Sequence, residues 1–325
     1  MFNLDKFTLT SLTSAINKAP YKPGQISALG IFEEASIPTT SAQVEIKEGV
    51  LRLVPVAPRD APPSPKNQER RKVITLGVPH VPATATIMAS EVQDVRAYGS
   101  ETNPLSVEAK RNEVIAEMRE DIDYTLEFHR LRALHGVFID INGDQTNLAT
   151  TFGVTAPSNV NMELTTSGTK VRAVKCMAIV RAIQAGLKGA TYTGIWAGCG
   201  ENFWEKLIGH PSVEAAYASY EAAVQLRSDP SLPFQFGGVN WFRYRGDSSV
   251  GIHTDKARVF PSGVRGMYLT RFAPANYIEA ANMPGLPYYA KAAVMKFDKG
   301  VELEAQSNPL NIVTRPEALL ELDVA

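Results

Sequence analysis

The chain has 325 residues, 44% of them hydrophobic and 21% charged, so it is long enough for two domains and can form a sizeable core. A formal net charge of −1 argues against a protein whose main role is to grip nucleic acid, because that role needs a basic surplus. The two cysteines exclude a disulfide framework, and no apolar run is long enough to span a membrane. Since the N-terminus also lacks a secretion signal, we expect a soluble protein from a reducing compartment.

The first 85 residues predict an arm followed by a long hairpin. Residues 1 to about 40 indicate a short helix and then an extended arm with little core of its own. Alternating apolar residues at 43–56 and 72–81 predict two strands. Four prolines between Pro58 and Pro65 favour an extended, low-entropy connection between them. Cationic residues follow or flank these prolines: Arg59, Lys66, Arg70, Arg71 and Lys72.

The clearest helix signal covers about 103–135. Asn103 can cap the helix, Pro104 suits its first turn, and Gly136 suits its end. Apolar residues recur mostly three or four positions apart, which predicts a rod roughly 45 Å long. Acidic residues lie on its charged outer face: Glu113, Glu117, Glu120 and Asp121.

The remaining chain predicts a second folded region. Asn142-Gly143 is typical of a tight hairpin turn. Strands and helices alternate between about 160 and 270, which predicts a compact α/β subdomain, and the last fifty residues return to strand character. A helix over about 169–187 is expected to bury one apolar face: Val171, Val174, Met177, Ala178 and Ile183.

The sequence shows no recognisable catalytic or metal-binding pattern. DINGD, 140–144, begins like a calcium loop, but Thr151 stands where the loop needs glutamate, so we favour a turn. GIWAGCG, 194–200, could cradle a phosphate, yet it matches neither common nucleotide-binding pattern and is better explained as a strand-to-helix turn. No histidine lies near Cys176 or Cys199 to activate a thiol. We therefore predict no catalytic residue, no metal and no cofactor.

The predicted hairpin needs a partner surface. Two strands without a third strand or a covering layer are marginally stable in water. If the partner were a neighbouring copy of the chain, the arm and the hairpin would act as clasps. The residues alone leave this interpretation and that of a solvated surface hairpin both open.

The carboxy-terminal third carries a family resemblance. Residues 261–291 and 300–322 contain F-A-P-A-x-Y-x-E, G-L-P-Y-Y and Q-S-N-P-L…R-P-E in that order. In these elements, and in the order of arm, hairpin, long helix and Asn-Gly turn, nearly the whole chain resembles the major capsid protein E family of lambda-type tailed phages. The resemblance implies an α+β, Hong Kong 97-like capsid fold and a structural protein rather than an enzyme.

The resemblance also implies a division of the chain into five parts. These are an N-terminal arm (1–40), an extended loop (41–85), a peripheral domain with a long spine helix (86–164), an axial domain (165–275), and C-terminal strands that return to the peripheral domain (276–325).

The implied function is that of the shell protein of a double-stranded DNA phage. Copies are expected to form pentamers and hexamers in the host bacterial cytoplasm, first as a procapsid that expands while DNA is packaged, and finally as the virion shell. The expected partners are the chain itself, a scaffolding protein, a portal and, in some such shells, a decoration protein. Because the arm begins near Met1, the scaffold is expected to be a separate protein. DNA would face the inner wall without specific binding, and no lysine–asparagine cross-link is predicted.

Contacts between copies form the site hypothesis. The five cations of the hairpin would pair with the four acidic residues of a neighbour's spine helix, unless those cations are only solvated. An encapsulin-like compartment protein and an oligomeric α/β enzyme that uses the 194–200 turn are the alternative functions.

Overall fold

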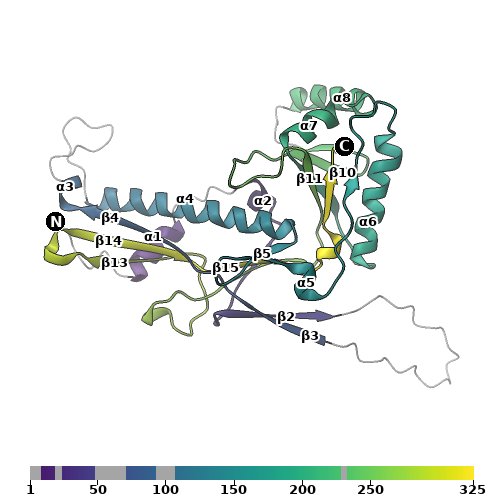
Figure 1. Cartoon of the computed structure of the whole chain (residues 1–325). Coiled ribbons are helices and arrows are strands. Elements are labelled where there is room, and N and C mark those ends of the chain that lie inside the picture. The colour runs from purple at the N-terminus through teal and green to yellow at the C-terminus, as the bar shows by residue number, and fades with distance from the viewer. Residues whose placement is uncertain (1–8, 19–23, 48–70, 93–106, 228–232) are drawn as a thin grey trace, which may run out of the picture.

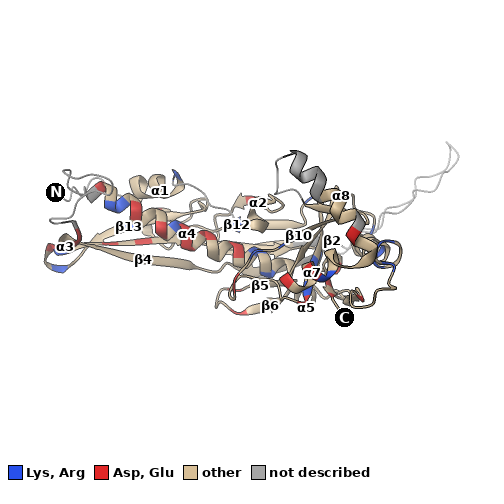
Figure 2. Cartoon of the chain, turned by 90° about the horizontal axis from the view of Figure 1, so that it is seen from above, with Lys and Arg blue, Asp and Glu red and all other residues tan. Residues whose placement is uncertain are grey.

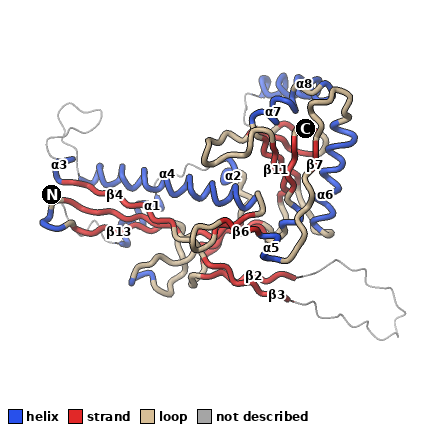
Figure 3. The backbone as a smooth tube through the Cα atoms, in the orientation of Figure 1, coloured by secondary structure: helices blue, strands red, loops and turns tan. Residues whose placement is uncertain are grey.

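The structure consists of a long body, an upright body and a projecting hairpin (Figure 1). It is a computed structural model that describes residues 9–18, 24–47, 71–92, 107–227 and 233–325. The long and upright bodies meet at an angle, and the hairpin leaves from below their junction (Figures 1 and 3).

The long body is a three-stranded antiparallel sheet covered by one long helix. Its strands, in order, are β13 (Tyr289–Val294), β14 (Gly300–Ser307) and β4 (Val81–Met88). Helix α4 (Val107–Leu134) is 28 residues long, which corresponds to about 42 Å. Gly136 follows it with a φ of +75°, as expected for the residue that ends a helix. The apolar face of α4 is buried as predicted: Val114, Ile115, Met118, Ile122, Leu126, Leu131 and Leu134.

Helix α1 (Leu9–Lys18) completes the core of the long body. Leu12 and Ile16 are fully buried in one cluster with residues of α4 and the sheet. The Arg119 guanidinium donates a hydrogen bond of 2.6 Å to the carbonyl oxygen of Ile16. The short helix expected at the start of the arm is therefore confirmed as α1, and the four-residue spacing of Leu12 and Ile16 gives it the apolar face that packs on the long body.

The upright body is built on a six-stranded mixed sheet. Its centre is the stacked pair of Phe203 and Trp241, whose ring centroids lie 6.3 Å apart, and both side chains are fully buried. The helices around the sheet are α6 (Met177–Leu187), α7 (Glu201–Ile208) and α8 (Pro211–Arg227). The strands, in order, are β7 (Val160–Asn161), β16 (Leu320–Asp323), β11 (Lys256–Ser262), β8 (Gly194–Cys199), β10 (Val239–Arg243) and β9 (Phe234–Phe236).

The C-terminal strands divide between the two bodies. We expected residues 276–325 to return to the long body, and β13 and β14 do so, but β16 lies between β7 and β11 in the upright sheet. The alternation of apolar and polar residues in a strand does not specify which sheet it joins, so this pairing was not predictable. A third sheet lies between the bodies and consists of β1 (Glu33–Ser36), β12 (Tyr268–Phe272) and β15 (Pro309–Val313).

The helix expected at 169–187 begins with a π-helical turn, Val171–Cys176, and continues as α6. A π-turn holds more residues than an α-turn and so rotates the buried face. Val174 and Met177, which we expected inside, are 55% and 43% exposed, and that part of the prediction is wrong. Val171 and Ile183 are buried as predicted, and the buried face also includes Cys176, Ile179 and Leu187.

The hairpin is confirmed at its root. Strand β2 (Ser41–Lys47) pairs antiparallel with β3 (Arg71–Gly77), and the tip, 48–70, lies outside the described residues. The strand expected at 72–81 is two strands, because β3 ends at Gly77 and β4 begins at Val81. Root side chains such as Val44 and Leu76 belong to the main core, so the chain itself covers this part of the hairpin.

Smaller elements fill the corners. The turn at Asn142-Gly143 joins two short strands as predicted, and the Asp140 carboxylate accepts hydrogen bonds from the backbone N–H groups of Asn142 and Asp144. This use of Asp140 supports the turn interpretation of DINGD. The short elements are α2 (Gln25–Ala28), α3 (Ala89–Val92), β5 (Val137–Ile139), β6 (Gln145–Asn147) and α5 (Leu148–Phe152).

The packing of α1 gives a stability prediction. Leu12→Ala should lower the free energy of unfolding by about 2–5 kcal/mol, because it leaves a cavity between α1 and α4. Thr10→Ala, on the exposed side of the same helix, should change it by less than about 0.5 kcal/mol. Urea unfolding measures both, and equal effects would contradict the burial of α1 against its own chain.

Candidate assembly surface

The structure places the predicted cationic residues only in part. Arg59, Lys66 and Arg70 lie outside the described residues. Arg71 and Lys72 begin β3, where their backbones pair with Lys47 and Ile46 of β2.

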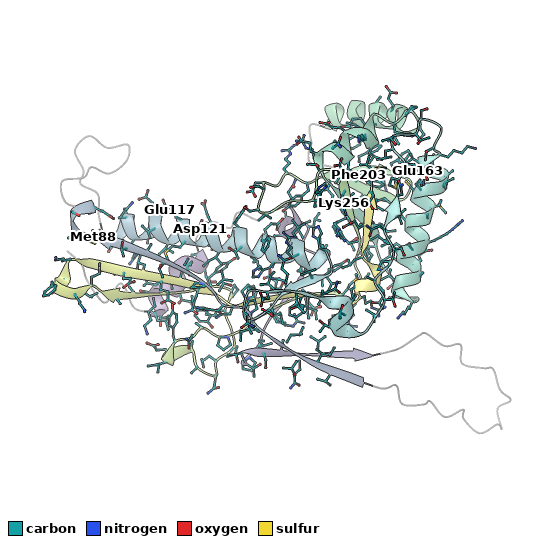
Figure 4. The ribbon with its side chains drawn as sticks, in the orientation of Figure 1. Met88, Glu117, Asp121, Glu163, Phe203 and Lys256 are labelled. Atoms are coloured by element: carbon teal, nitrogen blue, oxygen red, sulfur yellow. The ribbon has the colours of Figure 1, made fainter. Side chains whose placement is uncertain are left out.

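The predicted acidic residues lie together on α4. Glu113, Glu117, Glu120 and Asp121 are all exposed, on the side of the helix that does not pack on the sheet. Figure 4 labels Glu117 and Asp121, which are one helical turn apart, and Figure 2 shows acidic residues along the helix. Glu113 accepts an ion pair from Lys110 of the same helix at 3.2 Å.

Only the backbones of Arg71 and Lys72 can be placed relative to the acidic residues of α4, because the other three cations lie outside the described residues. Strands β2 and β3 leave from below the junction of the two bodies (Figure 1), whereas Glu117 and Asp121 lie on α4 in the long body (Figure 4).

A buried carboxylate holds the arm and both bodies in place. Glu127 of α4 accepts hydrogen bonds from the backbone N–H groups of Ile26 and Ser27 at 2.7 and 2.9 Å, and from the Ser27 hydroxyl at 2.7 Å. The hydroxyl of Tyr244, which follows β10 in the upright body, donates a fourth hydrogen bond at 3.1 Å. Burial and the nearby Glu127 carboxylate raise the pKa of Tyr244. This cluster fixes how the upright body sits on α4.

A second contact lies one turn earlier on the same helix. The Tyr124 hydroxyl donates a hydrogen bond of 2.5 Å to Asp247 in the loop after β10. That hydrogen bond, together with those from the backbone N–H groups of Val250 and Ser249, lowers the pKa of the Asp247 carboxyl. The hydrogen bond to Asp247 also raises the pKa of the Tyr124 hydroxyl, because loss of its proton would break that bond.

Burial shifts the pKa values of two histidines and two cysteines towards the neutral form. Burial lowers the pKa of His129 and of His135 to about 4. Burial also raises the pKa of the Cys176 thiol to about 12 and that of Cys199 well above its ordinary value. Neither thiol therefore forms a reactive thiolate near neutral pH.

The glycine-rich segment after β8 serves packing. A Cβ atom at Gly200 would lie 2.1 Å from the carbonyl oxygen of His253, so only glycine fits this close approach. The described residues contain no group of three or more His, Cys, Asp or Glu side chains placed to hold a metal ion. Among the helices in the described part of the chain, none is both long and apolar enough to cross a membrane.

Several large apolar side chains among the described residues are exposed. Ile278 is 94% and Phe297 is 89% exposed, and Met283 and Leu286 in the segment after Ile278 are exposed as well. We did not predict these positions, because a single apolar residue in a loop has no periodicity that marks it. Exposed apolar surface of this kind is typical of sites that contact other proteins.

The fold is that of a phage capsid protein of the Hong Kong 97-like type. The putative capsid protein of a prophage of E. coli CFT073 superposes with a TM-score of 0.64 over 98% of this chain and 99% of its own, at 14% identity. The capsid protein of an empty GTA particle gives a TM-score of 0.55 over 94% and 92% of the two chains, at 11% identity. At such identities the similarity concerns the fold alone.

The chain belongs to the family described as phage major capsid protein E, whose model matches residues 8–324. The major capsid protein of Pseudomonas phage KPP10 is 26% identical over 98% of this chain and 97% of its own. That of Salmonella phage Felix O1 is 24% identical over 98% and 96%. The protein is the major capsid protein of a tailed phage, a structural protein that assembles with copies of itself into a shell, rather than an enzyme.

The Glu127 cluster gives a second stability prediction. Glu127→Ala should lower the free energy of unfolding by about 3 kcal/mol, because it leaves buried N–H and O–H donors without an acceptor. Glu117→Ala, at an exposed position of the same helix, should change it by less than about 0.5 kcal/mol. Chemical denaturation measures both, and a small effect at Glu127 would show that the cluster does not hold the bodies together.

The buried histidine gives a pH prediction. His129 is protonated near pH 6.5 in the unfolded chain but only near pH 4 in the folded chain. The neutral, buried imidazole therefore stabilises the folded state fully above pH 6.5, and this part of the free energy of unfolding is lost as the pH falls towards 4. At pH 5 the loss should be roughly 2 kcal/mol for this residue. His129→Phe should reduce the fall in urea midpoint between pH 7 and 5, and His253→Phe, at an exposed site, should leave it unchanged. An equal fall in both variants would contradict the prediction.

Proposed function

We propose that this capsid protein forms the pentamers and hexamers of an icosahedral shell, which assembles as a procapsid in the host bacterial cytoplasm and expands as DNA is packaged. In the virion the chain would face the DNA without gripping it, in keeping with its net charge of −1. A scaffolding protein, a portal and, in some shells, a decoration protein would be its further partners.

The observation that carries the proposal is the placement of the hairpin. Side chains at its root pack into the core of its own chain, while its strands leave from below the junction of the two bodies (Figure 1). A hairpin that extends past its own core needs a further surface to cover it. In a closed shell, the long body of a neighbouring copy supplies that surface.

The contact is proposed to be partly electrostatic. The cations of the hairpin would lie over the acidic residues on α4 of the neighbouring copy. An exposed ion pair contributes only about 0–1 kcal/mol, but every copy repeats it and the closed shell adds the repeats together. The residues of this contact are Arg59, Lys66, Arg70, Arg71 and Lys72 on one copy and Glu113, Glu117, Glu120 and Asp121 on the next.

The division into five parts is also a proposal, with one change. The arm (1–40), the extended loop (41–85), the peripheral domain (86–164) and the axial domain (165–275) keep their bounds. The last part, 276–325, is proposed to serve both domains, because β13 and β14 lie in the long body and β16 in the upright one.

Charge reversal tests the proposed contact. Arg70→Glu with Arg71→Glu should leave the subunit folded but sharply reduce the yield of shells when it is co-expressed with its scaffolding protein, because like charges would then face each other. Adding Glu117→Lys and Asp121→Lys should restore part of the yield. Electron microscopy and sedimentation measure the shells.

The matched control reverses two exposed cations outside the hairpin, Arg245→Glu with Arg265→Glu, and should leave the yield near wild type. A full yield from the hairpin variant would rule out an electrostatic contact while leaving the capsid function intact. Failure of the wild-type chain to form any shell with its scaffold would instead contradict the proposed assembly.

A further inference from the structure

The turn between β13 and β14 holds an aromatic side chain out into solvent. It forms the outer end of the long body (Figure 1), and Phe297 within it is 89% exposed. Phe297 and Asp298 both have left-handed backbones, with φ angles of 64° and 54°. Non-glycine residues rarely adopt this conformation, and such strain concentrates at positions with a binding role.

The turn is held firmly in this shape. The N–H of Met295 donates to the carbonyl of Gly300 at 3.0 Å, and the N–H of Asp298 donates to the carbonyl of Met295 at 3.2 Å. A Cβ atom at Gly300 would lie 2.4 Å from the carbonyl oxygen of Ile87, so the start of β14 is packed tightly on β4. Phe297 is therefore presented by a fixed backbone, which lowers the ordering cost of binding.

A groove of about 560 Å³ lies elsewhere on the same chain, between the root of the hairpin and the sheet that joins the two bodies. One wall comes from β2 and the segment before it, and the other from β12 and β15. The Arg271 side chain lies in the groove, 3.8 Å from the carboxylate of Glu33, which is 61% exposed at its edge. The apolar lining residues are Ile37, Pro38, Ala42, Val44, Leu269 and Ile312.

The turn and the groove lie apart in one chain, the turn at the outer end of the long body and the groove at its junction with the hairpin (Figure 1). Two different surfaces of one chain that fit each other join copies head to tail, as the rings and shells of an assembling protein require. Charge favours this pairing, since exposed Lys296, Asp298 and Lys299 give the turn a surplus of one positive charge, which would approach Glu33 beside Arg271.

The other highly exposed side chain fits the groove less well. Ile278 is 94% exposed, but the charged residue next to it is Glu279, which pairs with Lys291 of its own chain at 2.8 Å and offers no cation to Glu33. Ile278 is also aliphatic, whereas Phe297 offers a larger apolar surface and a ring that can lie against Arg271.

We propose that Phe297 of one copy inserts into this groove of a neighbouring copy and anchors a contact between subunits. The contact of Phe297 with the groove is separate from the proposed contact of the hairpin with α4. This inference depends on the proposed function only because it requires the chain to assemble into shells.

A cysteine pair tests the contact directly in assembled shells. Phe297→Cys is combined with Gln43→Cys, an exposed residue that lines the groove. The native Cys176 and Cys199 are buried and give little background. On mild oxidation, a denaturing gel without reductant should show a ladder of covalently linked chains. Each single variant, and Ile278→Cys combined with Gln43→Cys, should show none.

A second measurement covers the possibility that the cysteine variants do not assemble. Phe297→Ala should raise the subunit concentration needed for assembly by about tenfold or more, because a large apolar contact is lost. Phe297→Leu should raise it much less, and Ile278→Ala is the matched control at an equally exposed site. The melting temperature of the free subunit should not change in any of the three variants.

The outcomes separate this inference from the proposed function. Shells that form normally but give no ladder, or an assembly threshold that Phe297→Ala leaves unchanged, would overturn the contact and leave the capsid role intact. A ladder of equal strength from the Ile278 pair would overturn it as well, since exposure alone would then explain the cross-link. Absence of shells from the wild-type chain would count against the proposed assembly and would be seen before any variant is made.

Discussion

The burial of one side of α4 is the contact on which the rest of the structure depends. Its apolar residues pack on the sheet of the long body and on α1, while Glu127 ties α2 and the upright body to the same helix. These contacts all lie on one continuous helix, so α4 packs in the long body and also contacts the upright body. The opposite side of the helix is left free to carry exposed charge.

That division of α4 has a consequence for assembly. The apolar contacts that hold the chain together are buried, whereas other large apolar side chains, such as Phe297 and Ile278, are almost fully exposed. Such a chain can fold by itself and still expose apolar side chains that are available to contact another protein. The family membership gives the physical answer, since a shell protein covers such surfaces with copies of itself.

The sequence predicted the elements better than their partners. The 3.6-residue period of α4, the glycine at its end and the Asn-Gly turn are local signals, and the structure confirms all three. The pairing of β16 with β11 joins residues more than sixty positions apart and leaves no local trace. On the helix at 171–187, Val174 and Met177 were assigned to the wrong face because a single π-turn shifts the phase and no residue type marks such a turn.

The surface residues show the same limit. Charged residues on α4 could be assigned to its outer side from periodicity alone, and their exposure agrees. Phe297 could not be found in this way, because its exposure follows from the backbone of a four-residue turn. The groove forms only because β2 and β12, which are far apart in the sequence, lie near each other in the fold, and the sequence alone does not show this. The order of the carboxy-terminal motifs indicated the family, although no local rule for helices, strands or turns would have singled these motifs out.

The central claim is that the protruding surfaces of this chain are completed by other copies of it. Cryo-electron microscopy of particles formed by the wild-type chain with its scaffolding protein tests this claim most directly. The account predicts closed shells in which the hairpin of each subunit lies across α4 of a neighbour. A population of single, fully packed subunits under these conditions, each with its hairpin folded against its own long body, would contradict it.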